Sequence, residues 1–201
     1  GLTISSAFVV VTVEESGVSD SEWQALVALY NATDGDNWTN NSGWDITENT
    51  LGDEEWFGVV IENNHIVDLG LPDNNLNGYL PEDIENLTFL RNFHIWGNKL
   101  TGSIPESIGE LSNLESINFE RNQFDGVFPP ALGKLTNLEY LYIYDNRLTG
   151  QLPPEIGNLS NLKVFDFGPN SLEGTIPYAY QNLSEIKHFS CFGTGLTGDI
   201  P

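Results

Sequence analysis

The sequence predicts an α/β repeat solenoid, because one phrase recurs along most of the chain at a fixed step of 24 residues. Three kinds of residue keep this step. The Asn positions are Asn74, Asn98, Asn122, Asn146 and Asn170, and Thr194 takes the next place. The Gly positions are Gly78, Gly102, Gly126, Gly150, Gly174 and Gly198, and the Pro positions are Pro81, Pro105, Pro129, Pro153, Pro177 and Pro201.

One copy of the phrase, Leu138–Pro153, shows what each position is expected to do. Leu141 and Ile143 alternate with three tyrosines, as inward and outward residues of a short strand do. Asn146 then turns the chain by hydrogen-bonding nearby backbone groups. A single copy cannot bury its own Leu and Ile residues, so neighbouring copies stack and their strands form a parallel sheet.

The phrase LxxLxLxxNxLxGxIP resembles the plant-type class of the leucine-rich repeat family, and the resemblance covers residues 66–201. It implies a curved right-handed solenoid with a parallel β-sheet on the concave face, where ligands chiefly bind. We expect six repeats there, the last one incomplete. Phe124 and Phe128 replace aliphatic residues, Gly168-Pro169 ends one strand, and Thr194 interrupts the Asn series.

Residues 19–65 are expected to cap the first repeat. Ser19 and Glu22 form a capping box before a helix over 19–32, with Trp23, Leu26, Val27 and Tyr30 on one face. A hairpin turn at Asn63-Asn64 follows. This segment resembles the family's cap, whose C-x-W-x-G-V-x-C motif carries a disulfide. Here Glu54 and Ile61 stand at the two Cys positions, so we expect Trp packing to hold a cysteine-free cap.

Residues 1–18 form an N-terminal extension outside the repeat. Its apolar run Ala7–Val13 is too short to span a bilayer, so we expect no membrane insertion in this segment. It is either a remnant of a signal peptide or an extended segment that pairs with a sheet edge or packs on the cap.

The balance of charge restricts the partners. Asp and Glu number 29 against 7 Lys and Arg, which gives a net charge of −22. Such a surface repels nucleic acid and anionic membranes. The single cysteine, Cys191, stands at a core position of its repeat and is expected to be a small buried hydrophobe.

Stepping by 24 residues predicts which side chains share the concave face. Tyr140, Tyr142 and Tyr144 lie on one strand, with Trp96 and Phe192 to either side. Exposed Tyr and Trp are typical anchors of binding sites, although such pairs also stabilise sheets. We therefore predict a protein or glycan ligand. The predicted ligand-binding residues are Trp96, Tyr140, Tyr142, Tyr144, His94, Glu120, Asp145, Asp166 and Phe192.

No motif predicts catalysis, a cofactor or a metal. His94 and His188 stand four repeats apart, roughly 19 Å at ~4.8 Å per strand, so they cannot share a site. Asp34, Asp36 and Asp45 match three positions of an EF-hand, but Trp38 and Thr39 occupy places that a calcium loop needs for other residues. We expect these carboxylates to shape turns.

The remaining expectations concern the alternative function, the cellular setting, glycosylation and the last repeat. Ice binding by a flat solenoid face is the alternative, with Thr101, Thr149 and Thr197 in one column, interrupted by Asp125 and Glu173. The resemblance implies an extracellular or cell-surface protein. Glycosylation sequons begin at Asn31, Asn37, Asn40, Asn86, Asn158 and Asn182. No polar cap follows the last repeat, so we expect a longer parent chain or self-association there.

Overall fold

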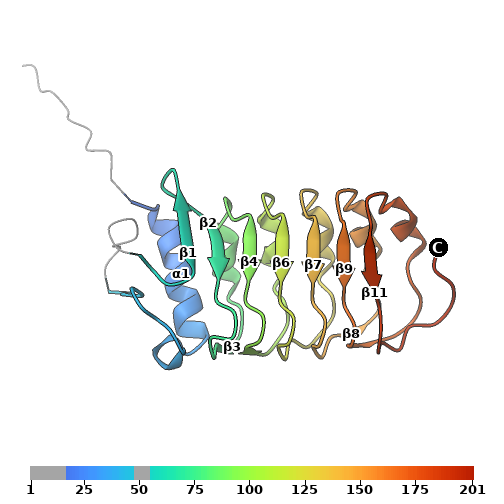
Figure 1. Ribbon diagram of the computed structural model, residues 1–201, viewed down its shortest axis with the longest axis horizontal. Helices are drawn as coiled ribbons and strands as arrows, with labels where there is room; N and C mark the ends of the chain where they lie inside the picture. The colour runs from blue at the N-terminus through green and yellow to red at the C-terminus, as the bar shows by residue number, and fades with distance from the viewer. Residues whose placement is uncertain (1–16, 48–54) are drawn as a thin grey trace, which may run out of the picture.

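The computed structural model describes residues 17–47 and 55–201. The apolar run Ala7–Val13, most of the predicted extension 1–18, and Glu54 lie outside these described residues. Strands of successive repeats stand side by side along the molecule (Figure 1), which confirms the predicted solenoid.

One sheet runs the length of the solenoid in the order β1-β2-β4-β6-β7-β9-β11. Its strands are β1 (Val59–Glu62), β2 (His65–Gly70), β4 (Asn92–His94), β6 (Ser116–Asn118), β7 (Tyr140–Tyr142), β9 (Val164–Asp166) and β11 (His188–Ser190). β1 and β2 form the predicted antiparallel hairpin, and Asn63 and Asn64 both have the positive φ that its tight turn requires. All later pairs are parallel, and their register follows the repeat: Asn92 pairs with Ser116, and Ser116 with Tyr140.

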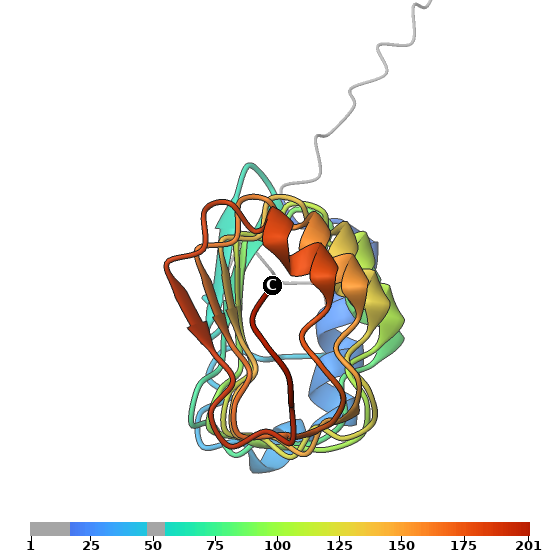
Figure 2. The same cartoon turned by 90° about the vertical axis from the view of Figure 1, so that its right-hand side faces the viewer.

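Short 3₁₀ helices cover the side opposite the sheet (Figure 2), one in each of the first five repeats. They are η2 (Glu82–Asn86), η3 (Glu106–Glu110), η4 (Pro130–Lys134), η5 (Pro154–Asn158) and η6 (Tyr178–Asn182). Each is preceded by a Pro with extended backbone angles, for example Pro105 and Pro153. We call this side the convex face. Two small parallel sheets line the turn between the faces: β3 (Asn77–Gly78) with β5 (Lys99–Leu100), and β8 (Thr149–Gly150) with β10 (Ser171–Leu172).

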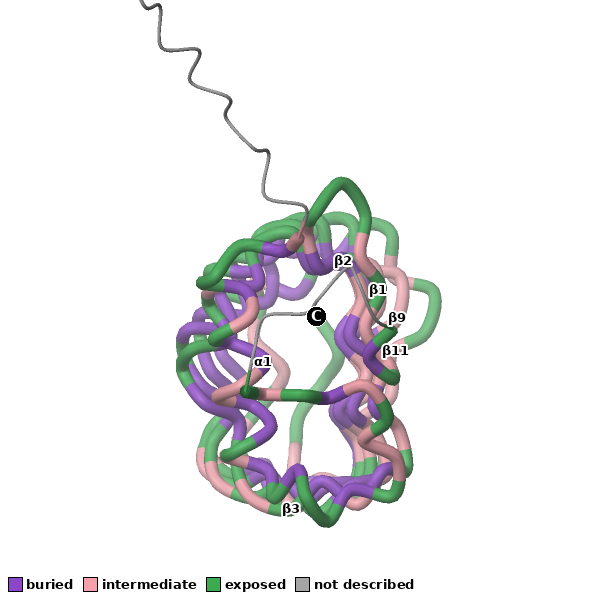
Figure 3. Tube along the Cα trace, turned by 90° about the vertical axis from the view of Figure 1, so that its left-hand side faces the viewer, coloured by how far each residue is buried: buried purple, intermediate pink, exposed green. Residues whose placement is uncertain are grey.

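The hydrophobic core fills the space between the sheet and the 3₁₀ helices, and buried residues line the inside of the coil (Figure 3). Leu141 and Ile143 are fully buried, as their alternation with the tyrosines predicts. Phe124 and Phe128, which replace aliphatic residues, are buried too. Cys191 is only half-buried and packs against the core, so the predicted full burial is wrong. The last repeat also leaves Ile186 and Phe189 partly exposed.

The repeated Asn side chains form a ladder inside the turns. The Nδ2 group of Asn98 donates to the carbonyl oxygens of Leu71 and Ile95, both at 2.8 Å. Its Oδ1 accepts from the backbone N–H of Asn74 at 3.0 Å and of Leu76 at 2.9 Å. These bonds join adjacent repeats and satisfy buried backbone groups.

Thr194 is shorter than Asn, and its hydroxyl donates to the Cys191 carbonyl at 2.8 Å within its own repeat. A second ladder, which the sequence analysis did not predict, lies near the surface. There Asn113, Asn137 and Asn161 each donate to a carbonyl of the preceding repeat, at 2.7 to 2.9 Å.

The cap begins with helix α1 (Asp20–Ala32), and the hydroxyl of Ser19 accepts from the Glu22 N–H as predicted. The predicted apolar face is only partly correct. Leu26 and Tyr30 are buried, but Trp23 and Val27 are half-buried, because the buried stripe runs through Ala25 and Leu29 instead.

Trp packing holds the cap, as expected. Trp44 lies between Trp38 and Trp56, with ring centroids 4.7 and 4.9 Å apart, and all three side chains are buried. The indole N–H of Trp38 donates to the Thr33 carbonyl at 3.0 Å, and that of Trp44 to the Phe57 carbonyl at 2.8 Å. The short helix η1 (Gly35–Asn37) connects α1 to this cluster.

Candidate ligand-binding face

The outward side of the long sheet, which we call the strand face, carries the predicted columns. The parallel register places His94 beside Asn118, Asn118 beside Tyr142, and Tyr142 beside Asp166. The neighbouring column runs from Asn92 through Ser116 and Tyr140 to Val164. A constant repeat length produces this alignment, because every strand begins at the same point of its copy.

The centre of the strand face is a tyrosine row on and just after β7. Tyr140, Tyr142 and Tyr144 alternate with buried Leu141 and Ile143, and each is half-buried. Their rings therefore keep solvent-accessible surface while their positions are fixed by the sheet. Rigid aromatic side chains of this kind lose little conformational entropy when a ligand binds.

Carboxylates flank the tyrosine row and shape its electrostatics. Partial burial raises the pKa of Tyr142, and the nearby Tyr140, Glu120 and Asp166 act in the same direction. Partial burial also raises the pKa of Tyr144, as does a hydrogen bond to the Glu120 side chain. The phenols are thus kept as neutral donors beside negative charge, an arrangement that suits a polar or cationic ligand.

One basic residue reaches this region from the edge. The Nζ of Lys163 lies 5.9 Å from the centre of the Tyr140 ring and 2.6 Å from a carboxylate oxygen of Glu139. The ion pair anchors the ammonium group over the ring, where a cation–π contact stabilises it. Tyr140 is therefore partly occupied by the protein's own cation, and Tyr142 and Tyr144 are the more available rings.

His94 lies on the same face, two strands from the tyrosine row. Its Nε2 is 2.9 Å from the Ser116 hydroxyl. Burial lowers the pKa of His94, and the nearby Asp68 acts weakly in the opposite direction. His94 is therefore neutral at pH 7 and can either donate or accept a hydrogen bond.

The remaining predicted residues lie further out. Trp96 is half-buried and is separated from Tyr144 by the Glu120 position, and Phe192 is separated from Tyr144 by Gly168. Phe192 is 85% exposed, and Asp145 is exposed on a residue with positive φ. The described ring contacts join none of these aromatics to the tyrosine row. The predicted aromatic band is thus a central row with two outlying rings, rather than one continuous patch.

A rim hollow that the sequence analysis missed adjoins the strand face. It has a volume of about 600 Å³ and lies between the β1–β2 hairpin and the loops that precede the next strands. His65 stacks on Phe89 there, with centroids 3.5 Å apart, and Arg91 pairs with Glu62 at 2.6 Å. The 24-residue step places Arg91 and Glu115 in one column, but it does not predict how far the hairpin projects beyond the loops.

The Asp side chains of the loop that follows α1 accept local hydrogen bonds. Asp36 accepts from the Tyr30 hydroxyl at 2.9 Å, Asp34 from Asn37 at 2.9 Å, and Asp45 from the Thr47 hydroxyl at 2.6 Å. Within residues 17–47 and 55–201, His, Cys, Asp and Glu form no group that could hold a metal ion. In the same part of the chain, no helix has the length and apolar character needed to cross a membrane.

Comparison with solved structures gives close matches to leucine-rich repeat ectodomains. The chain is 39% identical to the ectodomain of the receptor kinase GASSHO1/SCHENGEN3 from Arabidopsis thaliana, over 66% of this chain and 16% of that one, with a TM-score of 0.65. It is 27% identical to PEPR1, in the structure of PEPR1–AtPEP1, over 91% of this chain and 26% of that one, with a TM-score of 0.82. The chain therefore spans only 16% and 26% of the length of these two matched chains.

A plant ice-binding protein also matches, with 27% identity over 89% of this chain and 57% of that one, and a TM-score of 0.78. No curated protein matched in a sequence comparison. The family model described as "Leucine-rich repeat region" matches residues 60–197, which include all the strands from β2 onward. The chain belongs to the leucine-rich repeat family.

Proposed function

We propose that this chain is a non-catalytic recognition domain that binds a protein or glycan ligand on the strand face. The observation that carries the proposal is the tyrosine row, three half-exposed phenols on and just after β7, beside Glu120 and Asp166. Large, rigid aromatic side chains supply most of the binding energy in many interfaces. The fold is one that typically serves binding rather than catalysis.

The solved relatives support a protein or peptide ligand. The GASSHO1/SCHENGEN3 ectodomain was solved in complex with CASPARIAN STRIP INTEGRITY FACTOR 2, and PEPR1 with AtPEP1. Both receptors have the same repeat architecture as this chain. The similarity to the extracellular part of a membrane receptor also supports an extracellular or cell-surface setting. With a net charge of −22, this domain favours basic or neutral polar ligands, because like charge opposes docking.

The proposal is tested by screening the purified domain against extracellular proteins, peptides and a glycan array. Tyr142→Ala is expected to weaken the binding of any hit by at least about thirtyfold, as loss of a hot-spot aromatic costs ~2 kcal/mol or more. The matched control is Tyr178→Ala, which removes a 74% exposed tyrosine from η6 on the convex face. Equal affinity of the Tyr142→Ala variant and the parent would overturn the proposed site.

Ice binding is kept as the second candidate, since the plant ice-binding protein shares the fold over most of this chain. The hydroxyls of Thr101, Thr149 and Thr197 donate to glycine carbonyls of the preceding repeat, at 2.9 to 3.2 Å, and form one aligned row. Asp125 and Glu173 interrupt this row and are exposed. Inhibition of ice recrystallisation that is lost in a Thr101→Ala/Thr149→Ala variant would support this second function.

A further inference from the structure

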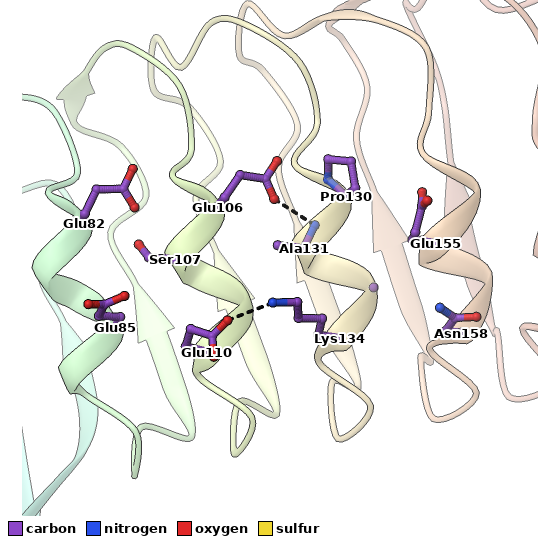
Figure 4. Close-up of a pocket in the computed structure, with 11 residues that line it drawn as sticks. Glu82, Glu85, Glu106, Ser107, Glu110, Pro130, Ala131, Lys134, Glu155 and Asn158 are labelled. Atoms are coloured by element: carbon purple, nitrogen blue, oxygen red, sulfur yellow. Dashed lines mark hydrogen bonds and ion pairs between the residues drawn. The ribbon is translucent and has the colours of Figure 1, made fainter.

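An acidic groove crosses the convex face, on the side of the molecule opposite the tyrosine row. It has a volume of about 600 Å³ and lies over η2, η3, η4 and η5 (Figure 4). Glu82 and Glu85 come from η2, Glu106 and Glu110 from η3, and Glu155 from η5. Among the described residues that line it, Lys134 is the only basic one.

The groove is hollow because small residues form its floor. Ser107, Ala131 and Gly133 occupy positions where larger side chains would fill the space between the helices. Gly109 and Gly133 also let successive 3₁₀ helices approach closely. A Cβ on Gly133 would lie 2.4 Å from the Glu155 carbonyl oxygen. The longer Glu side chains therefore stand as walls above a shallow, rigid floor.

Two carboxylates of the groove already have partners within the protein. Glu106 accepts from the Ala131 N–H at 3.1 Å, and Glu110 pairs with Lys134 at 2.8 Å (Figure 4). Glu82, Glu85 and Glu155 are exposed, and the described contacts give their carboxylates no hydrogen bond or ion pair. The groove thus retains uncompensated negative charge.

The observation that points to a ligand is Ser107. This residue is 7% exposed, and its Oγ is buried and has no hydrogen-bond partner within the described residues. Figure 4 shows Ser107 between η2 and η3, on the side toward Glu82 and Glu85. A buried hydroxyl without a partner is costly, and a donor that entered the groove would satisfy it.

We propose that this acidic groove binds a basic segment of a protein partner, with a Lys or Arg side chain inserted between η2 and η3. The inserted cation would donate to the Ser107 hydroxyl and be neutralised by Glu82 and Glu85. Charge complementarity favours this occupant, because charge-assisted hydrogen bonds to carboxylates are the stronger kind. The described residues hold no cluster able to chelate a metal ion, so an extended organic cation fits the groove better than a divalent ion.

The site is independent of the strand face, so the two proposals fail separately. The probe is a fluorescein-labelled peptide of alternating Arg and Ser, and its binding is measured by fluorescence anisotropy. A Glu82→Gln/Glu85→Gln/Glu155→Gln variant is expected to bind it about tenfold more weakly. The control, Asp125→Asn/Glu173→Gln/Asp199→Asn, removes the same charge from exposed positions outside the groove and is expected to lose no more than about threefold.

A pair of variants that leave the charge unchanged distinguishes a specific site at Ser107 from non-specific electrostatic attraction to the acidic surface. Ser107→Ala is expected to weaken peptide binding about fivefold, through the lost hydrogen bond to a charged donor, whereas exposed Ser160→Ala leaves it unchanged. The fold should survive Ser107→Ala, since the hydroxyl has no partner. Equal losses in the two charge variants, or no effect of Ser107→Ala, would overturn the proposal. So would displacement of the peptide by calcium chloride but not by sodium chloride of equal ionic strength.

Discussion

The carboxylate of Glu22 accepts a hydrogen bond from the backbone N–H of Ile66 at 3.0 Å, across a sequence separation of 44 residues. Its second oxygen lies 2.8 Å from the Ser19 hydroxyl and 3.3 Å from Nδ1 of His65. Glu22 is 2% exposed, so these partners replace the water that a carboxylate would otherwise have. One side chain therefore ties the capping helix to the first strand of the repeats.

We expect Glu22→Gln to destabilise the protein by about 1–3 kcal/mol, because an amide NH₂ would face donors where a carboxylate oxygen now accepts. Unfolding in urea, followed by circular dichroism, measures the change. Glu82→Gln is the matched control, since Glu82 is exposed and should alter stability by less than about 0.5 kcal/mol. Equal stability of the Glu22→Gln variant and the parent would show that the carboxylate of Glu22 adds nothing to the stability of the cap.

Glu22 also marks a limit of the sequence analysis. The capping box predicts the local bond between Ser19 and the Glu22 N–H, because both partners lie within one helical turn. It does not predict the bond to Ile66, which depends on how the helix packs against β2. The same limit explains Trp23 and Val27, whose predicted burial depended on helical spacing alone.

Most of the strand face, in contrast, could be predicted from the sequence. A constant step fixes the register of every parallel pair, so Tyr142 lies beside Asn118 and Asp166 as the columns predict. Spacing does not reveal which rings touch, or that Lys163 lies over Tyr140. The acidic groove and the rim hollow were missed for a related reason. They depend on where side chains leave space, and only packing determines this.

The second prediction concerns how much the buried Asn ladder stabilises the repeats. Asn98→Ala would leave the N–H groups of Asn74 and Leu76 without their side-chain acceptor in a buried turn. We expect a loss of about 2–4 kcal/mol, since each unsatisfied buried group is costly.

The control for this test is Asn137→Ala, which removes one exposed hydrogen bond of the second ladder, to the Ser112 carbonyl. Its cost should be below about 1 kcal/mol. Thermal and urea unfolding of both variants measure the difference. Similar costs for the two variants would mean that water enters the turn and replaces the Asn98 side chain.

The third prediction concerns stability at high pH. The Tyr180 hydroxyl donates to the Pro153 carbonyl at 3.0 Å, and burial raises the pKa of this phenol far above its ordinary value of 10.0. Above pH 10 the unfolded chain releases this proton while the native protein retains it. The Tyr180 hydroxyl therefore makes its full contribution to the free energy of unfolding below pH 10. This contribution is lost as the pH rises, by up to ~1.4 kcal/mol per pH unit.

Tyr180→Phe should consequently change both the free energy of unfolding and the way it depends on pH. At pH 7 we expect the variant to be less stable by about 0.5–1.5 kcal/mol, because the Pro153 carbonyl loses its donor. Above pH 10 the difference in stability between variant and parent should shrink and then reverse, since the variant has no proton to lose at this position.

Tyr142 and Tyr144 are present in both proteins, so the effects of their own raised pKa values cancel in the comparison. Tyr178→Phe, which removes an exposed hydroxyl at the start of η6, is the control, and urea unfolding from pH 7 to 11 measures all three proteins. Parallel curves for Tyr180→Phe and the parent would show that the native state also ionises Tyr180, and that its burial does not oppose ionisation.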